Sequence, residues 1–416
     1  MTTTSPGDAP ALAAERDRLL GFAQASRVEA GGFGWLTDVG TVDPAHDREL
    51  WITCRMTHVF ALATLLGDAE SADLVDHGLA ALTGLFADPV HGGWFSAVDA
   101  AGRPTVAEKA AYPHAFVILA TASAAVAGRP GAHDLLDAAL ATSERHFWDD
   151  AAGMSVESYD LGFTRLDAYR GVNANMHTVE AYLAAADALD HLGADGRLWR
   201  HRAARIARRV ASNAEANGWR VPEHYDERWR PDLEFNRDRP ADPFKPYGAT
   251  VGHGIEWARL LLHVAAAVPD EPAPHQTPLP QAAAQLFQRA LSDGWAVDGA
   301  DGFVYTTDWS GQPVVHQRMH WVVAEAINTA AAFRTLADPA VPDFSGWYDT
   351  AWNYVATHLI DRRRGSWHHE LDAGNQPSAT VWPGKPDIYH AYQATLIPLL
   401  PLAPTLAVAL AQQGLA

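Results

Sequence analysis

One pattern, repeated six times along the chain, constrains the fold more than any other feature of the sequence. Each copy begins with a Gly or Ser beside an aromatic residue, continues as a short alternating run and ends in Asp or Gly turn residues, which is typical of a small β-hairpin. Such repetition indicates one architecture built from copies of a single unit. The six segments are GGFGWLTDVG, GGWFSAVDAAGRP, GMSVESYDLG, NGWRVPEHYDERW, DGFVYTTDWSGQP and GSWHHELDAGNQP.

Two helices are predicted in each repeat. The first is rich in Ala and Leu, as in NMHTVEAYLAAADAL and GHGIEWARLLLHVAAAV, and the second is more polar, as in ADGRLWRHRAARIARRVASNA. A helix that is apolar on nearly every side must be buried on every side, so we assign the apolar helices to an inner ring and the polar ones to an outer ring. The predicted fold is all-α, an (α/α)6 barrel of six inner and six outer helices with short β-hairpins at one end. We expect a disordered N-terminus at 1–10 and a single catalytic domain at 11–416.

Charge and cysteine content exclude several classes of partner. A formal net charge of -19 would repel a nucleic-acid backbone. The lone cysteine, Cys54, excludes an intramolecular disulfide and any multi-cysteine metal site. The first residues lack the pattern of a signal peptide, and three prolines interrupt the most apolar segment near the C-terminus. We therefore expect a cytoplasmic monomer or homodimer that binds neither nucleic acid nor membrane, with the apolar C-terminal segment closing the core.

Polar residues occupy the starts of the apolar helices, where a purely structural repeat would carry aliphatic side chains. Equivalent helices begin at the same end of a barrel, so these residues should face one pocket, since buried polar groups without partners are costly. They are Trp51 and Arg55, Tyr112 and His114, Asn173 and His177, His253 and Glu256, His320 and Trp321, and Tyr389 and His390.

Two of these helix starts carry His-x-x-Glu, in His177 with Glu180 and His253 with Glu256. Residues three apart share a helix face, where the carboxylate can fix the imidazole tautomer and raise its pKa. Each pair could also be structural, and His390 could be a satisfied core histidine. Their matching repeat positions favour a functional site.

Arg55 lies among aliphatic residues and needs an anionic partner, which is either a fixed carboxylate or a substrate oxygen. No metal site is expected, because the di-iron and zincin patterns are absent. No Gly-rich phosphate loop is found either, so the prediction is no cofactor. Histidines and an arginine in a deep pocket suit proton abstraction next to a carbonyl. The aromatic residues suit stacking on a sugar ring, which makes a monosaccharide aldose the expected substrate. They include Trp51, Tyr112, Trp321 and Trp382.

Five motifs together resemble the N-acylglucosamine 2-epimerase superfamily, and they span nearly the whole chain. Within it, the resemblance is closest to the aldose–ketose isomerase branch, which includes mannose isomerases. The motifs are W-x3-R (Trp51, Arg55), K-x2-Y-x-H-A-F (from Lys109), N-x-N-M-H-x3-E (from Asn173), G-H-x2-E-W (from Gly252) and K-P-D-x-Y-H (Lys385 to His390).

This resemblance implies an (α/α)6 barrel, no metal requirement and a role for each site residue. By that analogy His390 moves a proton between C2 and C1 through a cis-enediol. His253, backed by Glu256, opens the pyranose ring and is the second acid/base. Arg55 and His177 hold the oxygens at C1 and C2, while Trp51, Tyr112, Asn173 and Trp321 bind the remaining hydroxyls.

An inserted segment at about 222–246 precedes the fourth inner helix and is expected to cover the pocket as a lid. Lys245 within it is a candidate to contact the C6 substituent of the sugar. The favoured hypothesis is that the protein is a metal-independent isomerase that interconverts D-mannose and D-fructose, and also D-lyxose and D-xylulose. The alternatives are a sugar 2-epimerase, a sulfoquinovose isomerase, a glycoside hydrolase on the same barrel and a sugar-binding protein without catalysis.

Overall fold

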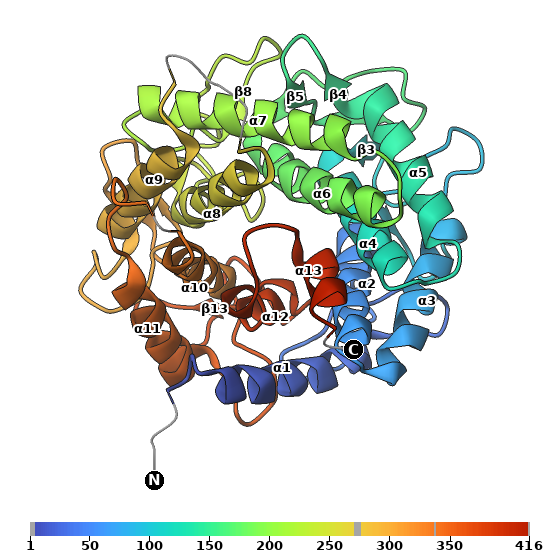
Figure 1. Cartoon of the computed structure of the whole chain (residues 1–416), viewed down its shortest axis with the longest axis horizontal. Coiled ribbons are helices and arrows are strands. Elements are labelled where there is room, and N and C mark those ends of the chain that lie inside the picture. Colours follow the sequence, from blue (N-terminus) through green and yellow to red (C-terminus); the bar gives the residue numbers. More distant parts are fainter. Residues whose placement is uncertain (1–4, 270–275, 337, 415–416) are drawn as a thin grey trace. The chain divides into compact units, whose positions relative to one another are not determined.

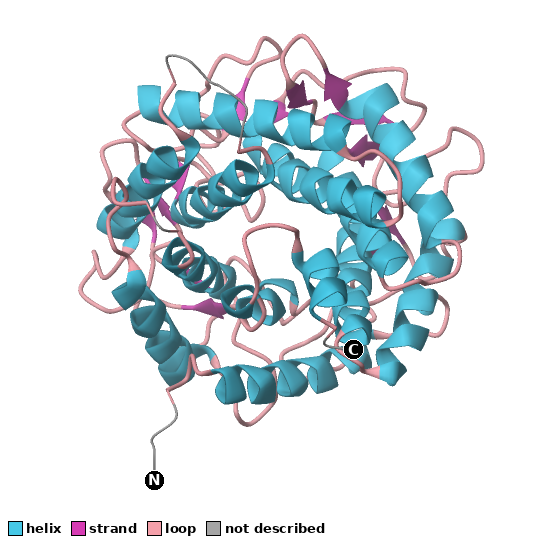
Figure 2. Ribbon diagram, viewed as in Figure 1, coloured by secondary structure: helices cyan, strands magenta, loops and turns pink. Residues whose placement is uncertain are grey.

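The computed structural model describes residues 5–269, 276–336 and 338–414. Long helices dominate it, and the strands are short (Figure 2). The described chain forms two compact units made of interleaved segments. Unit 1 holds the residues up to Phe22 together with Ala207–Tyr225 and Arg230–Leu402, and unit 2 holds Ala23–Ile206, Asp226–Trp229 and the residues from Ala403 onward. The expectation of a single domain therefore stays a prediction.

Unit 2 is built around three inner helices, which are α2 (Leu50–Leu65), α4 (Ala111–Val126) and α6 (Val172–His191). Helix α4 packs against both of the others, and nearly all of its side chains are buried, as its all-round apolar sequence predicts. The outer helices α3 (Ala69–Thr83) and α5 (Ala132–Thr142) cover α2 and α4.

The C-terminal segment completes the core of unit 2. Helix α13 (Leu406–Gln413) packs on α2, α4 and α6, so the apolar C-terminus closes the core as expected. In the part of the chain that the structure describes, we find no helix with the length and apolar character needed to cross a membrane. Helix α7 (Arg197–Ala216) begins in unit 2 and ends in unit 1.

Unit 1 repeats the arrangement of inner and outer helices. Helix α8 (Val251–Ala267) packs against α9 (Leu279–Gly294) and α10 (His320–Arg334), and α10 contacts α11 (Ser345–Tyr354) and α12 (Tyr389–Ala394) (Figure 1). The sixth inner helix, α12, is shorter than predicted because a 3-10 turn containing Pro398 follows it.

Helix α1 (Ala9–Ala23) corrects the predicted disordered N-terminus. It begins inside the range expected to be disordered, and the Tyr348 hydroxyl donates a hydrogen bond to the Gly7 carbonyl. Farther along, the Trp367 indole donates to Glu15 at 2.6 Å, so α1 packs on the sixth hairpin. Residues 1–4 of the predicted disordered segment lie outside the described residues.

Short strands tie four of the inner helices to the hairpin of the following repeat. Strands β1, β3, β9 and β12 immediately precede inner helices, and each pairs antiparallel with a strand of the next hairpin, β2, β6, β10 and β13 respectively. This pairing fixes where each helix starts. The bounds are β1 Arg48–Glu49, β2 Ala97–Val98, β3 Glu108–Ala110, β4 Trp148–Asp149, β5 Met154–Ser155, β6 Ser158–Asp160, β7 Arg170–Gly171, β8 His224–Tyr225, β9 Ala249–Thr250, β10 Thr306–Thr307, β11 Pro313–Val315, β12 Arg318–Met319 and β13 Glu370–Leu371.

A buried cation stands just before most of the inner helices. Lys109 donates to the Asp88 carboxylate at 2.6 Å and to the Gly92 carbonyl, and Lys385 donates to Asp361 at 2.7 Å and to the Gly365 carbonyl. In each case the cation binds both the first acidic residue and a carbonyl of a tight hairpin turn. The cations that hold such positions are Arg48, Lys109, Arg170, Arg318 and Lys385, each no more than 6% exposed.

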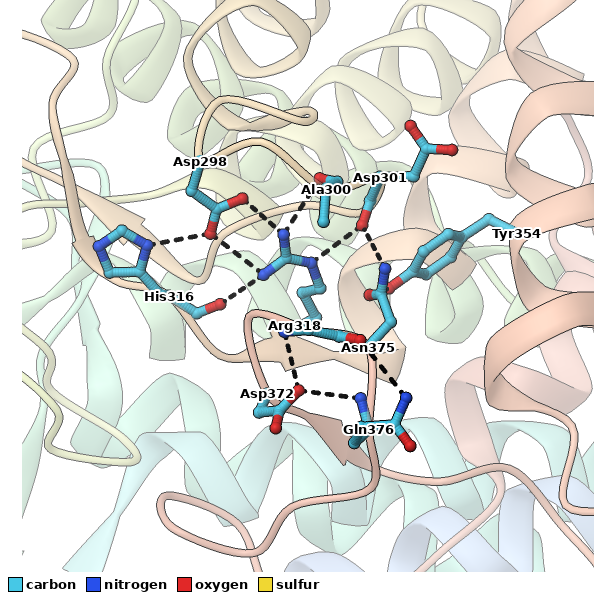
Figure 3. A network of polar contacts seen from close by, with 10 residues as sticks. Asp298, Ala300, Asp301, His316, Arg318, Tyr354, Asp372, Asn375 and Gln376 are labelled. Atoms are coloured by element: carbon cyan, nitrogen blue, oxygen red, sulfur yellow. Dashed lines mark hydrogen bonds and ion pairs between the residues drawn. The ribbon is translucent and has the colours of Figure 1, made fainter.

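Arg318 makes the most extensive of these connections (Figure 3). Its guanidinium donates to the Asp298 carboxylate at 2.6 Å and to the carbonyls of Ala300, Asp301 and His316. The Asp298 carboxylate and the carbonyls of the turn thus have a hydrogen-bond donor, which buried polar groups require. Arg318 therefore fixes the strand that leads directly into α10.

Replacing Lys385 by Met should destabilise the protein by about 3 kcal/mol, because the Asp361 carboxylate would stay buried without its cation. Burial alone would raise the pKa of Asp361, but the hydrogen bond from Lys385 and two backbone N–H groups lower it to about 2. A carboxyl whose pKa is lower in the folded state stabilises the fold at any pH above its unfolded pKa. This stabilisation is lost as the pH falls through the folded pKa. The penalty should therefore be full at neutral pH and shrink between about pH 4 and pH 2.

Urea unfolding of the wild type and Lys385→Met at several pH values measures this penalty. Arg237→Met is the matched control, since Arg237 pairs with Glu234 on an exposed surface and its loss should barely move the midpoint. A Lys385→Met midpoint equal to that of the control would contradict the structural role of the buried pair.

Candidate active site

Two histidines of unit 1 each contact a buried carboxylate through Nδ1. His253 on α8 donates to Glu223 at 2.9 Å, and His390 on α12 donates to Glu325 at 2.9 Å. The Trp321 ring, at the start of α10, lies 5.4 Å from the His253 ring and 5.8 Å from the His390 ring. The two histidine–carboxylate pairs thus flank one tryptophan.

The carboxylates decide which nitrogen of each histidine can react. An ionised carboxylate only accepts hydrogen bonds, so Nδ1 must carry a proton and Nε2 becomes the nitrogen that exchanges protons. The carboxylate also stabilises the imidazolium that forms when Nε2 takes a proton. Both histidines are therefore equipped for acid/base chemistry.

The partner of His253 differs from the predicted one. The sequence pattern assigned Glu256 to this role, but the carboxylate against His253 is Glu223, which lies just before β8. Glu256 instead lies 3.4 Å from the Arg259 guanidinium on the same helix. The spacing of three residues allowed a His253–Glu256 contact, but the packing of the fourth hairpin against α8 supplies a different carboxylate.

Glu325 is held ionised although it is fully buried. Arg259 donates to its Oε2 at 2.7 Å, and Asn328 and His390 donate to its Oε1. Burial by itself would raise the pKa of the Glu325 carboxyl, but the charge of Arg259 and the contact with His390 lower it to about 2. The partner of His390 is therefore an ionised carboxylate at neutral pH.

Glu256, Glu325 and His390 bring three possible ligand atoms within 4.8 Å of one another. Such a set can hold a metal ion, but here a guanidinium already binds both carboxylates. A divalent ion would have to compete with Arg259 for the same oxygens, and its charge would be repelled by the arginine. In this structure Arg259 supplies the positive charge that faces the two carboxylates.

Two loops of unit 1 carry the other predicted substrate contacts. The Trp382 ring meets the Phe244 ring edge-on at 5.2 Å, and the Glu370 carboxylate accepts the backbone N–H of Trp382 at 2.7 Å. Lys245 follows Phe244, and its carbonyl accepts a hydrogen bond from Asn236 at 2.7 Å. These contacts anchor the inserted segment and the loop before α12 to each other, whereas a lid motion of the segment stays a prediction.

Unit 2 gathers the remaining predicted residues. The Arg55 guanidinium lies over the rings of Trp51 at 5.0 Å and Phe116 at 4.4 Å, and it donates to the Tyr112 hydroxyl at 3.3 Å. The His177 ring lies 4.6 Å from that of Phe116. Trp51, Arg55, Tyr112 and His177 thus form one cluster at the starts of α2, α4 and α6.

His177 keeps the predicted relation to its glutamate. Its Nδ1 lies 3.6 Å from a carboxylate oxygen of Glu180, which is an ion-pair distance, and both side chains are largely buried. Asn173 lies half-buried one turn earlier on α6. By contrast His114 donates to the Ala139 carbonyl at 2.9 Å, and burial lowers its pKa to about 4, so it is a neutral core histidine.

The sequence analysis missed three residues of the histidine cluster, which are Glu223, Arg259 and Glu325. Two of them were detectable, because Arg259 and Glu325 are charged residues within helices predicted to be buried on every side, where a charge needs a specific partner. Glu223 carries no such signal, since it stands in a polar hairpin segment.

Comparison with known proteins places this site in a family. The family model of N-acylglucosamine 2-epimerase (GlcNAc 2-epimerase) matches residues 31–394. The chain is 50% identical over 406 residues to the D-mannose isomerase of Thermobifida fusca, covering 97% of each protein. It is 46% identical over 408 residues to the D-mannose isomerase of Pseudomonas cannabina pv. alisalensis, covering 98% of this chain and 96% of the relative.

A solved structure, the crystal structure of a D-mannose isomerase, is similar with a TM-score of 0.85 at 26% identity, covering 96% of this chain and 99% of that one. The protein is therefore an isomerase. It belongs to the N-acylglucosamine 2-epimerase family, and the resemblance read from its motifs is confirmed. The predicted fold class, all-α with the (α/α)6 arrangement, is confirmed as well.

The position of Trp321 depends on the absence of a side chain at Gly252. A Cβ at Gly252 would overlap the Trp321 ring and lie 2.7 Å from Val322 Cγ2, so Gly252→Ala should displace the tryptophan and destabilise the protein by roughly 1–3 kcal/mol. Near-ultraviolet circular dichroism and thermal unfolding measure the two effects.

Gly254→Ala on the same helix is the matched control. Its Cβ would meet only Ala290 at an ordinary 3.5 Å, so this variant should keep the aromatic spectrum and gain up to about 1 kcal/mol from its better helix propensity. Equal behaviour of the two variants would show that Trp321 does not require the close approach of α8.

Proposed function

We propose that the protein is a metal-independent aldose–ketose isomerase that interconverts D-mannose and D-fructose, and D-lyxose and D-xylulose, in the cytoplasm. The observation that carries the proposal is the pair of histidines beside Trp321, each with Nδ1 on a buried carboxylate. Two acid/base groups are what a reaction needs that both opens a sugar ring and moves a proton between adjacent carbons. The D-mannose isomerases among the relatives support the choice of sugar.

The proposed reaction opens the sugar ring and then moves one proton from C2 to C1 and one from O2 to O1. His253 takes the proton of the C1 hydroxyl and returns a proton to the ring oxygen, which yields the open-chain aldose. His390 Nε2 then takes the C2 proton, the electrons of that C–H bond form the C1=C2 bond, and the C1 carbonyl oxygen becomes the enediolate oxygen of a cis-enediol. The proton of the O2 hydroxyl passes to O1, and His390 returns its proton to C1 as the electrons of O2 form the C2=O2 bond of the ketose.

Glu325 and Glu223 act through the two histidines in this scheme. The carboxylate charge favours the imidazolium that forms at each transfer, while the hydrogen bond holds the ring at one orientation. Trp321 lies against both rings and offers an apolar face to the sugar. Glu256 contributes through Arg259 rather than through His253.

The other substrate contacts rest on the family resemblance and stay predictions. Arg55 and His177 are assigned to the oxygens at C1 and C2, where a guanidinium stabilises the developing enediolate charge. Hydroxyl and stacking contacts are assigned to Trp51, Tyr112, Asn173, Trp382 and, at C6, Lys245.

The first test is proton NMR of the EDTA-treated protein with D-mannose in D2O. Fructose should appear without added metal, with deuterium at C1 wherever the enediol stage exchanges with solvent. Glucose as the first product would replace the isomerase proposal by an epimerase. An absence of turnover with mannose, lyxose and glucose would rule out a neutral aldose and direct the search to sulfoquinovose.

Replacing His390 by Gln should lower kcat at least about 100-fold, since the base that takes the C2 proton is lost. Mannose binding, measured by calorimetry, should persist, because stacking and hydroxyl contacts remain. The matched control is His191→Gln, at the exposed end of α6, which should keep wild-type turnover. Unchanged turnover in His390→Gln would remove this residue from the mechanism.

A further inference from the structure

Arg259 is the buried cation of the His390 cluster, and the reaction scheme gives it no contact with substrate. It lies on α8, is 3% exposed, and bridges two carboxylates, with Nε 2.7 Å from Glu325 and Nη2 3.4 Å from Glu256. Glu325 in turn accepts the Nδ1 hydrogen bond of His390. One guanidinium thus connects α8, α10 and α12 around the proposed base.

The charges of this cluster are nearly balanced. With both carboxylates ionised, Glu256, Glu325 and Arg259 together carry a charge of -1, and protonation of His390 brings the charge of these four groups to zero. The groups are almost fully buried, so little solvent screens their interaction. Without Arg259 the same space would hold two carboxylates against one imidazole, and His390 would retain its proton up to a higher pH.

We infer that Arg259 is a positioning residue that sets the proton affinity of His390: it offsets one of the two neighbouring carboxylates and aims the other at Nδ1. The inference rests on the proposed function for its catalytic meaning, but the proton affinity itself is a property of the free protein. The positive charge of Arg259 favours the neutral form of His390, which can accept a proton. The Glu325 carboxylate stabilises the imidazolium that forms when the proton is accepted.

Other titratable groups of unit 1 lie near His390, and each has contacts of its own. His320 on α10 stacks on His369 at 3.7 Å, and burial lowers the pKa of His369 well below its usual range, so His369 adds no positive charge. Lys385, which precedes α12, donates to Asp361. Tyr389 lies edge-on to His390 at 4.8 Å.

Three substitutions separate the charge of Arg259 from its shape. Arg259→Met removes the charge, and the titration of the His390–Glu325 pair should move up by about one pH unit or more. Glu256→Gln removes one carboxylate, and the titration should move down. Arg259→Lys keeps the charge but loses the planar fork, so the titration should stay near that of the wild type while kcat falls.

The direct measurement is NMR titration of the protein labelled with 13C at histidine Cε1, in which the His390 signal is identified by its loss in His390→Gln. The pH profile of kcat/KM is recorded in parallel, and its acid limb should follow the His390 titration. Arg289→Met is the control, because Arg289 on α9 pairs with Asp293 outside the cluster and should leave both curves unchanged.

Opposite shifts in Arg259→Met and Glu256→Gln support the inference, and shifts in the same direction or none overturn it. If Arg259→Met does not fold, the other two variants decide. A His390 titration that moves to lower pH in Glu256→Gln and stays unmoved in Arg259→Lys supports the inference. A His390 titration that stays unmoved in Glu256→Gln overturns it. The NMR titration needs no substrate. Failure of wild-type protein to convert mannose would therefore count against the proposed function, whereas unmoved histidine titrations count against the role of Arg259.

Discussion

The placement of the inner-helix starts depends on buried cations bound to hairpin turns. Lys109, Arg318 and Lys385, each just before an inner helix, reach both a turn carboxylate and a turn carbonyl, as Lys385 does with Asp361 and Gly365. Neither partner could be buried alone, because an isolated charge or carbonyl in the interior is costly. The pairing of short strands then aligns each helix start with the following hairpin. Side chains at those starts consequently have fixed positions, which is what a site made of helix-start residues requires.

The two histidine–carboxylate pairs have the same Nδ1–oxygen distance of 2.9 Å, but their carboxylates come from different kinds of structural element. Glu325 comes from the middle of an inner helix, Arg259 and Asn328 hold it by hydrogen bonds, and the charge of Arg259 lowers its pKa. Glu223 comes from the loop before β8, and the adjacent His224 donates to the Pro246 carbonyl at 2.8 Å at the end of the inserted segment. The environment of His253 is therefore linked to the inserted segment, while Glu325, the partner of His390, belongs to a core helix. This difference fits the proposed division, in which His253 opens the ring and His390 takes the proton from carbon.

Much of the fold was predictable because it repeats. Periodic hairpin signals and all-round apolar helices specify helix pairs without any long-range information, and the solved relatives have the same fold. The exceptions have local causes. Pro398 shortens the sixth inner helix, and α1 forms because Glu15 and Arg18 find partners in the sixth hairpin, more than three hundred residues away in the chain.

The sequence by itself determined the family and the helix-pair architecture, and it indicated His253 and His390 as candidate acid/base residues, since each of these follows from local patterns or motifs. Only the tertiary structure decided which carboxylates serve the histidines. Spacing of three residues made Glu256 the natural partner of His253, yet the actual partners, Glu223 and Glu325, lie 30 and 65 residues away from their histidines. The physical reason is that a hydrogen bond forms with whichever acceptor packing brings within about 3 Å, and packing joins elements that are distant in sequence. Arg259 contacts the carboxylate of Glu256 on its own helix and that of Glu325 on α10. It can bridge the two carboxylates because α8 and α10 pack against each other.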